Sequence, residues 1–282
     1  MKIVVTGRHG QLGSELYDLT SNNSQFQMVF VDREEMDLSN SVEIKTVLNT
    51  EKPNIIVSAG AYTAVDKAES DQDLCNAVNH LAVQAIGEWA AENNAKVIHI
   101  STDYVFDGLS EIPLKETDIP KPLNVYGATK LKGEQALQNS GAAYVIIRTA
   151  WVYSTYGANF VKTMLRLMNE RDEIGVVADQ IGTPTYARDL AQAILDIIQS
   201  TEFTQGIYHY SNEGSISWHD FAVAIKEIKG FTTKVNAINS DAFPTPAKRP
   251  NFSLLDKTKI TETYGVKVPN WKISLQEMLS KM

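Results

Sequence analysis

Lys2-Ile-Val-Val-Thr-Gly-Arg-His-Gly-Gln-Leu-Gly13 is the stretch of sequence that says most about the fold. Its first half is short, β-branched and ended by glycine, which is typical of a strand buried in a parallel sheet. The glycines that follow lead into an expected helix over residues 14–20. Such glycines permit a tight turn, close approach of a pyrophosphate and packing of helix on strand. The pattern predicts a phosphate site at the helix N-terminus, formed by Gly7, His9, Gly10, Gln11, Leu12 and Gly13, although a tight turn without a ligand is the alternative.

The next segments suit a dinucleotide. An expected strand over residues 28–31 ends in Asp32-Arg33, about twenty residues past the glycines, where a carboxylate can hold an adenosine ribose hydroxyl. Arg33 could instead neutralise a 2′-phosphate, so the sequence leaves NADPH and NADH both open. Further candidate cofactor contacts are the Asp37-Leu38 pair and the small residues after an expected strand at 55–58, Ala59-Gly60-Ala61-Tyr62.

Strands and helices alternate through the first half of the chain. Further strands are expected at 96–100 and 144–147, with a helix at 76–93. This order predicts an α/β protein with a Rossmann-like, doubly wound parallel sheet. Beyond Ser154 the alternation loosens, which indicates a smaller C-terminal α/β substrate-binding lobe. We expect the dinucleotide-binding domain to comprise residues 1–152 and about 174–212, and the lobe to comprise residues 153–173 and 213–282.

Tyr126-Gly-Ala-Thr-Lys130 stands at the start of an expected helix over residues 128–138. Residues four apart lie on one helical face, so a phenol and an ammonium would be paired there. We expect the positive charge to lower the pKa of the phenol and to suit it to acid–base chemistry. Taken alone, the pattern more often means a packed aromatic ring beside a solvated lysine. Its place in the chain is what favours chemistry.

Candidate substrate contacts follow later strands, where ligands of open parallel sheets bind. Thr102 could donate to a carbonyl and Asp103 could accept from a sugar hydroxyl. Trp151 could cover a sugar face or equally anchor the core. Lys248 and Arg249 could bind a diphosphate, or belong to a solvated basic loop.

Composition narrows the class of protein. The 282 residues carry a formal net charge of -8, which disfavours nucleic acid and anionic membranes as partners. A single cysteine excludes an intramolecular disulfide and fits a reducing compartment. Neither a secretory signal nor a membrane span is expected, and the five histidines form no metal motif. We therefore expect a cytoplasmic protein and assign no metal ligands.

These segments together resemble the extended short-chain dehydrogenase/reductases, most closely the dTDP-4-dehydrorhamnose reductase family. The likeness runs in order from residue 4 to residue 256. It rests on Val5-Thr-Gly-x-x-Gly-Gln-Leu-Gly13, Ala61-Tyr-Thr-Ala-Val-Asp-Lys-Ala-Glu69, Ser101-Thr-Asp-Tyr-Val-Phe-Asp-Gly108, Tyr126-Gly-x-x-Lys-x-x-Gly-Glu134, Arg148-Thr-x-Trp-Val-Tyr153, Gly182-Thr-Pro-Thr185 and Arg249-Pro250 to Asp256.

The resemblance implies NAD(P)H-dependent reduction of the C4 keto group of dTDP-4-dehydro-L-rhamnose to dTDP-L-rhamnose. It makes Tyr126 the general acid, Lys130 the residue that holds the nicotinamide ribose, and Thr102 the hydroxyl of the triad. Thr102, Asp103 and Trp151 would contact the deoxysugar. Tyr62 stands where some members have histidine, which leaves its contact with the cofactor open. Some relatives use a divalent metal such as Mg²⁺ at a dimer contact, but no residue here is assigned to one.

Two other functions remain open at this point. The chain could be another nucleotide-sugar epimerase, dehydratase or 4-ketoreductase. It could also be a non-catalytic partner resembling the regulatory subunit of methionine adenosyltransferase, although intact Tyr126, Lys130 and Thr102 argue against this. The sequence leaves monomer and homodimer equally open.

Overall fold

A six-stranded parallel sheet forms the centre of the computed structural model, which describes residues 1–21 and 25–282. The strand order is β10-β5-β4-β3-β1-β2, so the chain winds outward in both directions from β1. In such sheets a ligand crevice lies beyond the carboxyl ends of the strands, where the order reverses. The strands are β1 (Lys2–Thr6), β2 (Gln27–Val31), β3 (Ile55–Ser58), β4 (Lys96–Thr102), β5 (Ala143–Thr149) and β10 (Gly206–His209).

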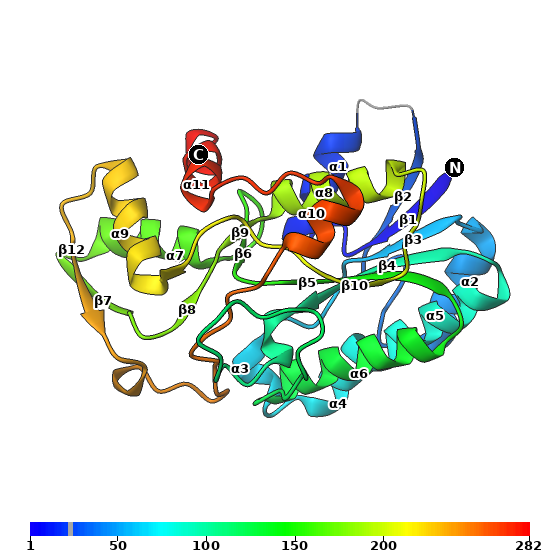
Figure 1. Ribbon diagram of the computed structural model, residues 1–282, viewed down its shortest axis with the longest axis horizontal. Helices are drawn as coiled ribbons and strands as arrows, with labels where there is room; N and C mark the ends of the chain where they lie inside the picture. The colour runs from blue at the N-terminus through cyan, green and yellow to red at the C-terminus, as the bar shows by residue number, and fades with distance from the viewer. Residues whose placement is uncertain (22–24) are drawn as a thin grey trace.

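Helices cover both faces of this sheet, as the sequence predicts (Figure 1). Successive strand residues point to opposite faces, so Ile3 and Val5 join one core while Val4 joins the other. One face is covered by α1 (Gln11–Thr20), α8 (Ala187–Gln199) and α10 (Thr258–Tyr264). The other is covered by α2 (Ser41–Glu51), α5 (Ala82–Glu92) and α6 (Val125–Asn139).

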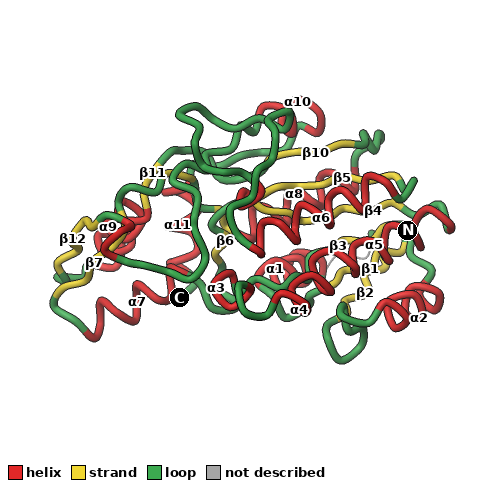
Figure 2. Tube along the Cα trace, turned by 90° about the horizontal axis from the view of Figure 1, so that it is seen from below, coloured by secondary structure: helices red, strands yellow, loops and turns green. Residues whose placement is uncertain are grey.

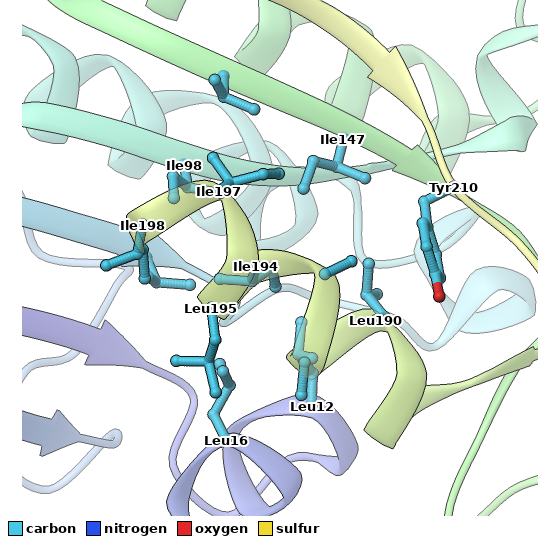
Figure 3. Packing of buried hydrophobic residues seen from close by; sticks show 14 of the residues in the cluster. Leu12, Leu16, Ile98, Ile147, Leu190, Ile194, Leu195, Ile197, Ile198 and Tyr210 are labelled. Carbon is cyan, nitrogen blue, oxygen red and sulfur yellow. The ribbon is translucent and has the colours of Figure 1, made fainter. Parts of the chain in front are cut away.

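Figure 3 shows the first of these cores, where apolar side chains of α1 and α8 interdigitate below the sheet residues Ile98 and Ile147. Leu12 belongs to this core and is 8% exposed. Any contact that it makes with a cofactor must therefore come from its backbone. Burial of leucine and isoleucine side chains on both faces fixes the sheet and hence the positions of the strand ends.

The helical stretch that we expected at 76–93 is interrupted. It consists of α4 (Gln72–Asn76), a π-helical turn (Ala77–Leu81) and α5, and is preceded by the short α3 (Val65–Ala68). The π-helical turn packs against α6, which carries Tyr126 and Lys130. π-Turns inside helices are common near functional sites.

A smaller lobe lies beyond the carboxyl ends of the strands, as Figures 1 and 2 both show. The chain enters it directly from β5. Its apolar core gathers Phe221, Ile225 and Leu275 with their neighbours. Its helices are α7 (Phe160–Glu170), α9 (Trp218–Lys229) and α11 (Trp271–Ser280). Its strands pair as β6 (Val152–Tyr153) with β9 (Thr185–Tyr186), β7 (Glu173–Val177) with β12 (Lys234–Ile238), and β8 (Ile181–Gly182) with β11 (Ile216–Ser217).

The segment expected to return to the dinucleotide-binding domain at residue 174 begins inside β7. That strand pairs with β12 in the lobe, whereas α8 and β10 from the same segment pack on or join the main sheet. We therefore propose that the return begins at α8. Within residues 1–21 and 25–282, no helix combines the length and the apolar character needed to cross a membrane.

Candidate active site

The glycine turn after β1 has the tight geometry that its sequence predicts. Gly7 has φ +76°, a left-handed conformation that favours glycine, and a Cβ at Gly13 would lie 2.1 Å from the Gly7 carbonyl oxygen. Gly10 is the N-cap of α1, and no described side chain caps the helix there. The first N–H groups of α1 and its positive dipole end are therefore available to an anion.

The end of β2 is tied to this turn. The backbone N–H of His9 donates to Asp32 Oδ2 at 2.6 Å, and the His9 ring lies 3.2 Å from the same oxygen. Arg33 is largely exposed and lies 3.7 Å from Asp37, whose own carboxylate accepts two hydrogen bonds from Ser39. Those hydrogen bonds lower the pKa of Asp37, which is therefore an anion at neutral pH. Asp32 therefore lies beside the turn, and Arg33 and Asp37 follow it in the chain.

The loop after β3 completes the same region. A Cβ at Gly7 would lie 2.8 Å from Gly60 Cα, and a Cβ at Gly60 would lie 2.7 Å from Leu38 Cδ1. The glycines therefore allow two loops to touch, which is a close approach that sequence alone did not reveal. Tyr62 donates its hydroxyl to Asp71 at 3.1 Å, and its backbone is held by Asn79. Ala59 and Ala61 flank Gly60 on this loop.

The start of α6 presents Tyr126 to the end of β4. The helix begins at Val125, three residues earlier than expected, because Asn124 accepts from the Gly127 N–H at 2.8 Å and Glu69 accepts from the Val125 N–H at 2.9 Å. The Tyr126 phenol lies close enough to the Thr102 hydroxyl for that hydroxyl to lower its pKa. Phenol and hydroxyl are thus brought together, as the sequence predicts.

The pKa that we expected for Tyr126 is wrong. Burial raises it above the ordinary value for tyrosine, and the negative charge of Asp103 acts in the same direction. The neighbouring Thr102 hydroxyl only partly opposes this rise in pKa, and the Lys130 charge does not offset it. Spacing along a helix places two groups on one face, but it does not reveal how strongly the protein excludes water from them.

Thr102 also differs from expectation. Its hydroxyl donates to Asp103 Oδ1 at 3.0 Å and accepts from the Tyr104 N–H at 3.2 Å. A threonine has one hydroxyl hydrogen, so Thr102 cannot also donate to a substrate carbonyl while it bonds to Asp103. Asp103 is 1% exposed, and its Oδ2 has no hydrogen-bond partner among the described residues. Burial raises the pKa of Asp103 to about 6.

Lys130 lies one helical turn after Tyr126 on α6 and is 2% exposed. Its ammonium donates to the Ile100 carbonyl at 2.6 Å and contacts His99 Nε2 at 3.2 Å. Burial lowers the pKa of Lys130 to about 8, and the charge of Glu134 partly opposes this. Glu134 itself is buried and forms a bidentate ion pair with Arg148, with Nη2 2.7 Å from Oε2.

The glycine turn and the buried groups on α6 suit a dinucleotide-dependent oxidoreductase. Similarity to known proteins supports this assignment. A family model described as RmlD substrate binding domain matches residues 1–282. A dTDP-4-dehydrorhamnose reductase from Aggregatibacter actinomycetemcomitans is 41% identical, covering 98% of this chain and 98% of its own. The chain belongs to the dTDP-4-dehydrorhamnose reductase family.

Solved structures from this reductase family share the whole architecture. The reductase from Clostridium acetobutylicum has a TM-score of 0.96 at 39% identity, covering 100% of this chain and 99% of that one. The reductase from Bacillus anthracis, solved in complex with NADP, has a TM-score of 0.95 at 36% identity, with coverage of 100% and 99%. Both the doubly wound sheet and the lobe are therefore features of the family.

Trp151 and Arg249, two residues that we expected to contact the substrate, are each held by another side chain of the protein. Trp151 has φ +49° and stacks on Trp218 of α9 with ring centroids 3.6 Å apart. It is partly buried, so packing accounts for at least one face of the ring. Arg249 is held by Asp66 through two hydrogen bonds of 3.0 and 2.8 Å. The sequence did not reveal this pair, because the two residues are 183 positions apart.

The residues present suit a dinucleotide. The uncapped helix N-terminus, the glycine cradle and the carboxylates after β2 match the donors and acceptors that a pyrophosphate and a ribose require. The described residues offer no comparable set of ligands for a divalent metal. Within the described ranges, 1–21 and 25–282, no three His, Cys, Asp or Glu side chains gather closely enough to hold a metal ion.

Sequence reasoning missed the groups that surround Lys130. His99 was one of five histidines dismissed because they form no metal motif, yet its ring touches the ammonium. A signal was present, because a histidine inside an otherwise apolar strand just before Ser-Thr-Asp needs a polar partner. Glu134 was quoted as part of a motif, but its pairing with Arg148 could not be inferred from residues 14 positions apart.

Proposed function

We propose that this chain reduces the C4 keto group of dTDP-4-dehydro-L-rhamnose to give dTDP-L-rhamnose, with NADPH as reductant. The observation that carries the proposal is the meeting of Thr102, Asp103 and Tyr126 at the carboxyl end of β4. Membership of the reductase family and a relative's complex with NADP support it. The glycine turn would hold the pyrophosphate, with Asp32 and Arg33 near the adenosine ribose and Asp37, Leu38 and residues 59–62 lining the remainder.

The role of each side chain in the proposed reaction follows from whether it can donate a proton or a hydrogen bond. The bound dinucleotide supplies the hydride that reduces the carbonyl carbon. Tyr126, whose pKa is raised by burial, stays protonated at neutral pH and can give its proton to the oxygen as negative charge develops there. Thr102 does not supply a second donor to this oxygen, because its own hydrogen is donated to Asp103. Lys130 offers its remaining N–H to the ribose.

Asp103 is the best candidate to hold the sugar. Its buried Oδ2 has no hydrogen-bond partner among the described residues and can accept from a sugar hydroxyl. Because its pKa is raised to about 6, this acceptor is ionised above pH 6 and becomes protonated below it. Activity should therefore fall as the pH drops through about 6.

Asp103→Asn tests that assignment. We expect kcat/KM for the sugar to fall by about tenfold, because a neutral amide replaces a charged acceptor. We also expect the acid limb near pH 6 to disappear, because asparagine does not titrate. The measurement is kcat/KM as a function of pH for both proteins. An acid limb that persists in the variant would assign it to another group.

The assignment of the reaction is tested by following oxidation of NADPH and of NADH with dTDP-4-dehydro-L-rhamnose and identifying the product sugar. We expect steady consumption of NADPH and formation of dTDP-L-rhamnose. Epimerases and dehydratases retain and recycle their cofactor, so protein that purifies with stoichiometric NAD and consumes no reduced cofactor would contradict the proposal.

Gly13→Ala tests the glycine cradle. The added Cβ would meet the Gly7 carbonyl oxygen at 2.1 Å, so the turn must shift. Such overpacking costs roughly 1–3 kcal/mol of stability, and the displaced turn should bind NADPH more weakly. Gly206→Ala is the control, because a Cβ there would meet the flexible tip of Lys259 at 3.3 Å and the Tyr208 ring at an ordinary contact distance of 3.5 Å. Equal NADPH affinity in the two variants, measured by calorimetry, would remove the turn from the binding site.

A further inference from the structure

The buried imidazole of His99 takes no part in the proposed reaction. His99 lies inside β4 and is 0% exposed. Its Nδ1 lies 3.1 Å from Ser58 Oγ at the end of β3, and its Nε2 lies 3.2 Å from Lys130 Nζ. It is the only titratable group of the sheet for which a hydrogen bond to the Lys130 ammonium is described.

The contact defines the tautomer of His99. An ammonium has three N–H donors and no acceptor, so His99 Nε2 must accept from Lys130. The hydrogen of a neutral imidazole then sits on Nδ1 and points to Ser58. Burial and the nearby positive charge lower the pKa of His99 well below its ordinary value, so the ring stays neutral.

Two of the three N–H groups of the Lys130 ammonium have acceptors within the chain. One goes to the Ile100 carbonyl and one to His99 Nε2. We propose that His99 is a positioning residue: together with the Ile100 carbonyl it fixes the Lys130 ammonium so that a single N–H remains free to bind the ribose of the cofactor. This inference rests on the proposed function, because it specifies how that same site holds Lys130.

Other groups around Lys130 set its charge but do not replace this contact. Glu134 of α6 lies one turn further along the helix and favours the ammonium, and its own charge is shared with Arg148 of β5. Burial raises the pKa of the Cys75 thiol in α4, so this group stays neutral and brings no charge to the ammonium. Tyr126 of α6 is protonated. His99 therefore supplies the one neutral side-chain acceptor described at the ammonium.

Three variants separate this role from simple packing. His99→Gln places an acceptor near the position of Nε2, whereas His99→Asn keeps only the group on the Ser58 side. His209→Asn is the matched control, because His209 is also 0% exposed but contacts the Leu114 carbonyl instead of Lys130. The Lys130 pKa would be read from the Cε and Nζ chemical shifts in NMR titrations of the free proteins, with the signal assigned by Lys130→Arg.

We expect His99→Asn to lower the pKa of Lys130 by about one unit, because the ammonium loses a hydrogen bond. His99→Gln and His209→Asn should leave it near the wild-type value. In turnover with NADPH, His99→Asn should reduce kcat/KM for the cofactor by about 10- to 100-fold and move the basic limb of the pH profile downward. His99→Gln should restore most of this loss. An unchanged Lys130 pKa in His99→Asn, or equal changes in all three variants, would overturn the inference.

One measurement needs no variant and stands even if His99→Asn does not fold. The ¹⁵N shifts of the His99 ring in the wild-type protein should show a hydrogen on Nδ1 and none on Nε2. The opposite tautomer would overturn the inference. Because these NMR measurements use the free protein, they remain decisive if the wild type fails to reduce dTDP-4-dehydro-L-rhamnose, in which case only the proposed function would fall.

Discussion

Tyr126→Phe should lower kcat by about 10²- to 10⁴-fold, which is the usual loss when a general acid is removed. In the proposed mechanism the phenol protonates the developing oxyanion, because Thr102 donates its only hydroxyl hydrogen to Asp103. The affinity for NADPH should change little, because the substitution removes one oxygen and leaves the glycine turn untouched. Steady-state kinetics and calorimetric titration with NADPH measure the two quantities separately.

Tyr104→Phe is the matched control for this experiment. The Tyr104 ring packs edge-on against Tyr126 with centroids 5.6 Å apart, so the same hydroxyl is removed from the neighbouring ring. We expect this variant to keep kcat within about a factor of ten, because the proton donor remains in place. Turnover by Tyr126→Phe at the wild-type rate would exclude Tyr126 from the chemistry.

Glu134→Ala should lower the free energy of unfolding by about 3–5 kcal/mol, because it leaves the Arg148 guanidinium buried without its counter-ion. Glu134 and Arg148 are each 1% exposed, and Ser101 donates a further hydrogen bond of 2.5 Å to the Glu134 carboxylate. Arg148 Nη1 already has no hydrogen-bond partner among the described residues, which leaves little to compensate for the loss. Chemical denaturation monitored by circular dichroism gives the free energy.

The exposed pair of Arg166 and Glu170 provides the comparison, with N and O atoms 2.9 Å apart on α7. Removing Glu170 should cost roughly 0.5 kcal/mol or less, because water screens the charges. A double variant, Glu134→Leu with Arg148→Met, should recover much of the stability lost by Glu134→Ala, because no charge stays buried alone. A cost for Glu134→Ala as small as that for Glu170→Ala would mean that water reaches Arg148.

Local patterns predicted the strands and helices of the main sheet well. The first strand, the glycine turn and α1 follow from β-branched residues and glycine spacing, which act over a few residues. The placement of β7 did not follow, because its pairing with β12 joins segments about sixty residues apart and has no local signature. The early start of α6 depends on Glu69, which is equally distant in sequence.

The candidate site shows the same division. The sequence named Tyr126, Lys130, Thr102 and Asp103, and the structure brings Tyr126, Thr102 and Asp103 together. The sequence could not give the pKa values of these groups. Burial raises the pKa of Tyr126 and lowers that of Lys130, and burial depends on packing from distant segments. The pairing of Arg249 with Asp66 across the two parts of the chain was invisible for the same reason.

The fate of the transferred hydrogen tests the central claim most directly. The chain would be incubated with dTDP-4-dehydro-L-rhamnose and NADPH deuterated at the transferable position of nicotinamide C4, and the sugar would be analysed by mass spectrometry and NMR. We predict one deuterium at C4 of dTDP-L-rhamnose for each NADPH consumed. An unlabelled sugar product, or no consumption of NADPH, would contradict the assignment of this chain as a C4 ketoreductase.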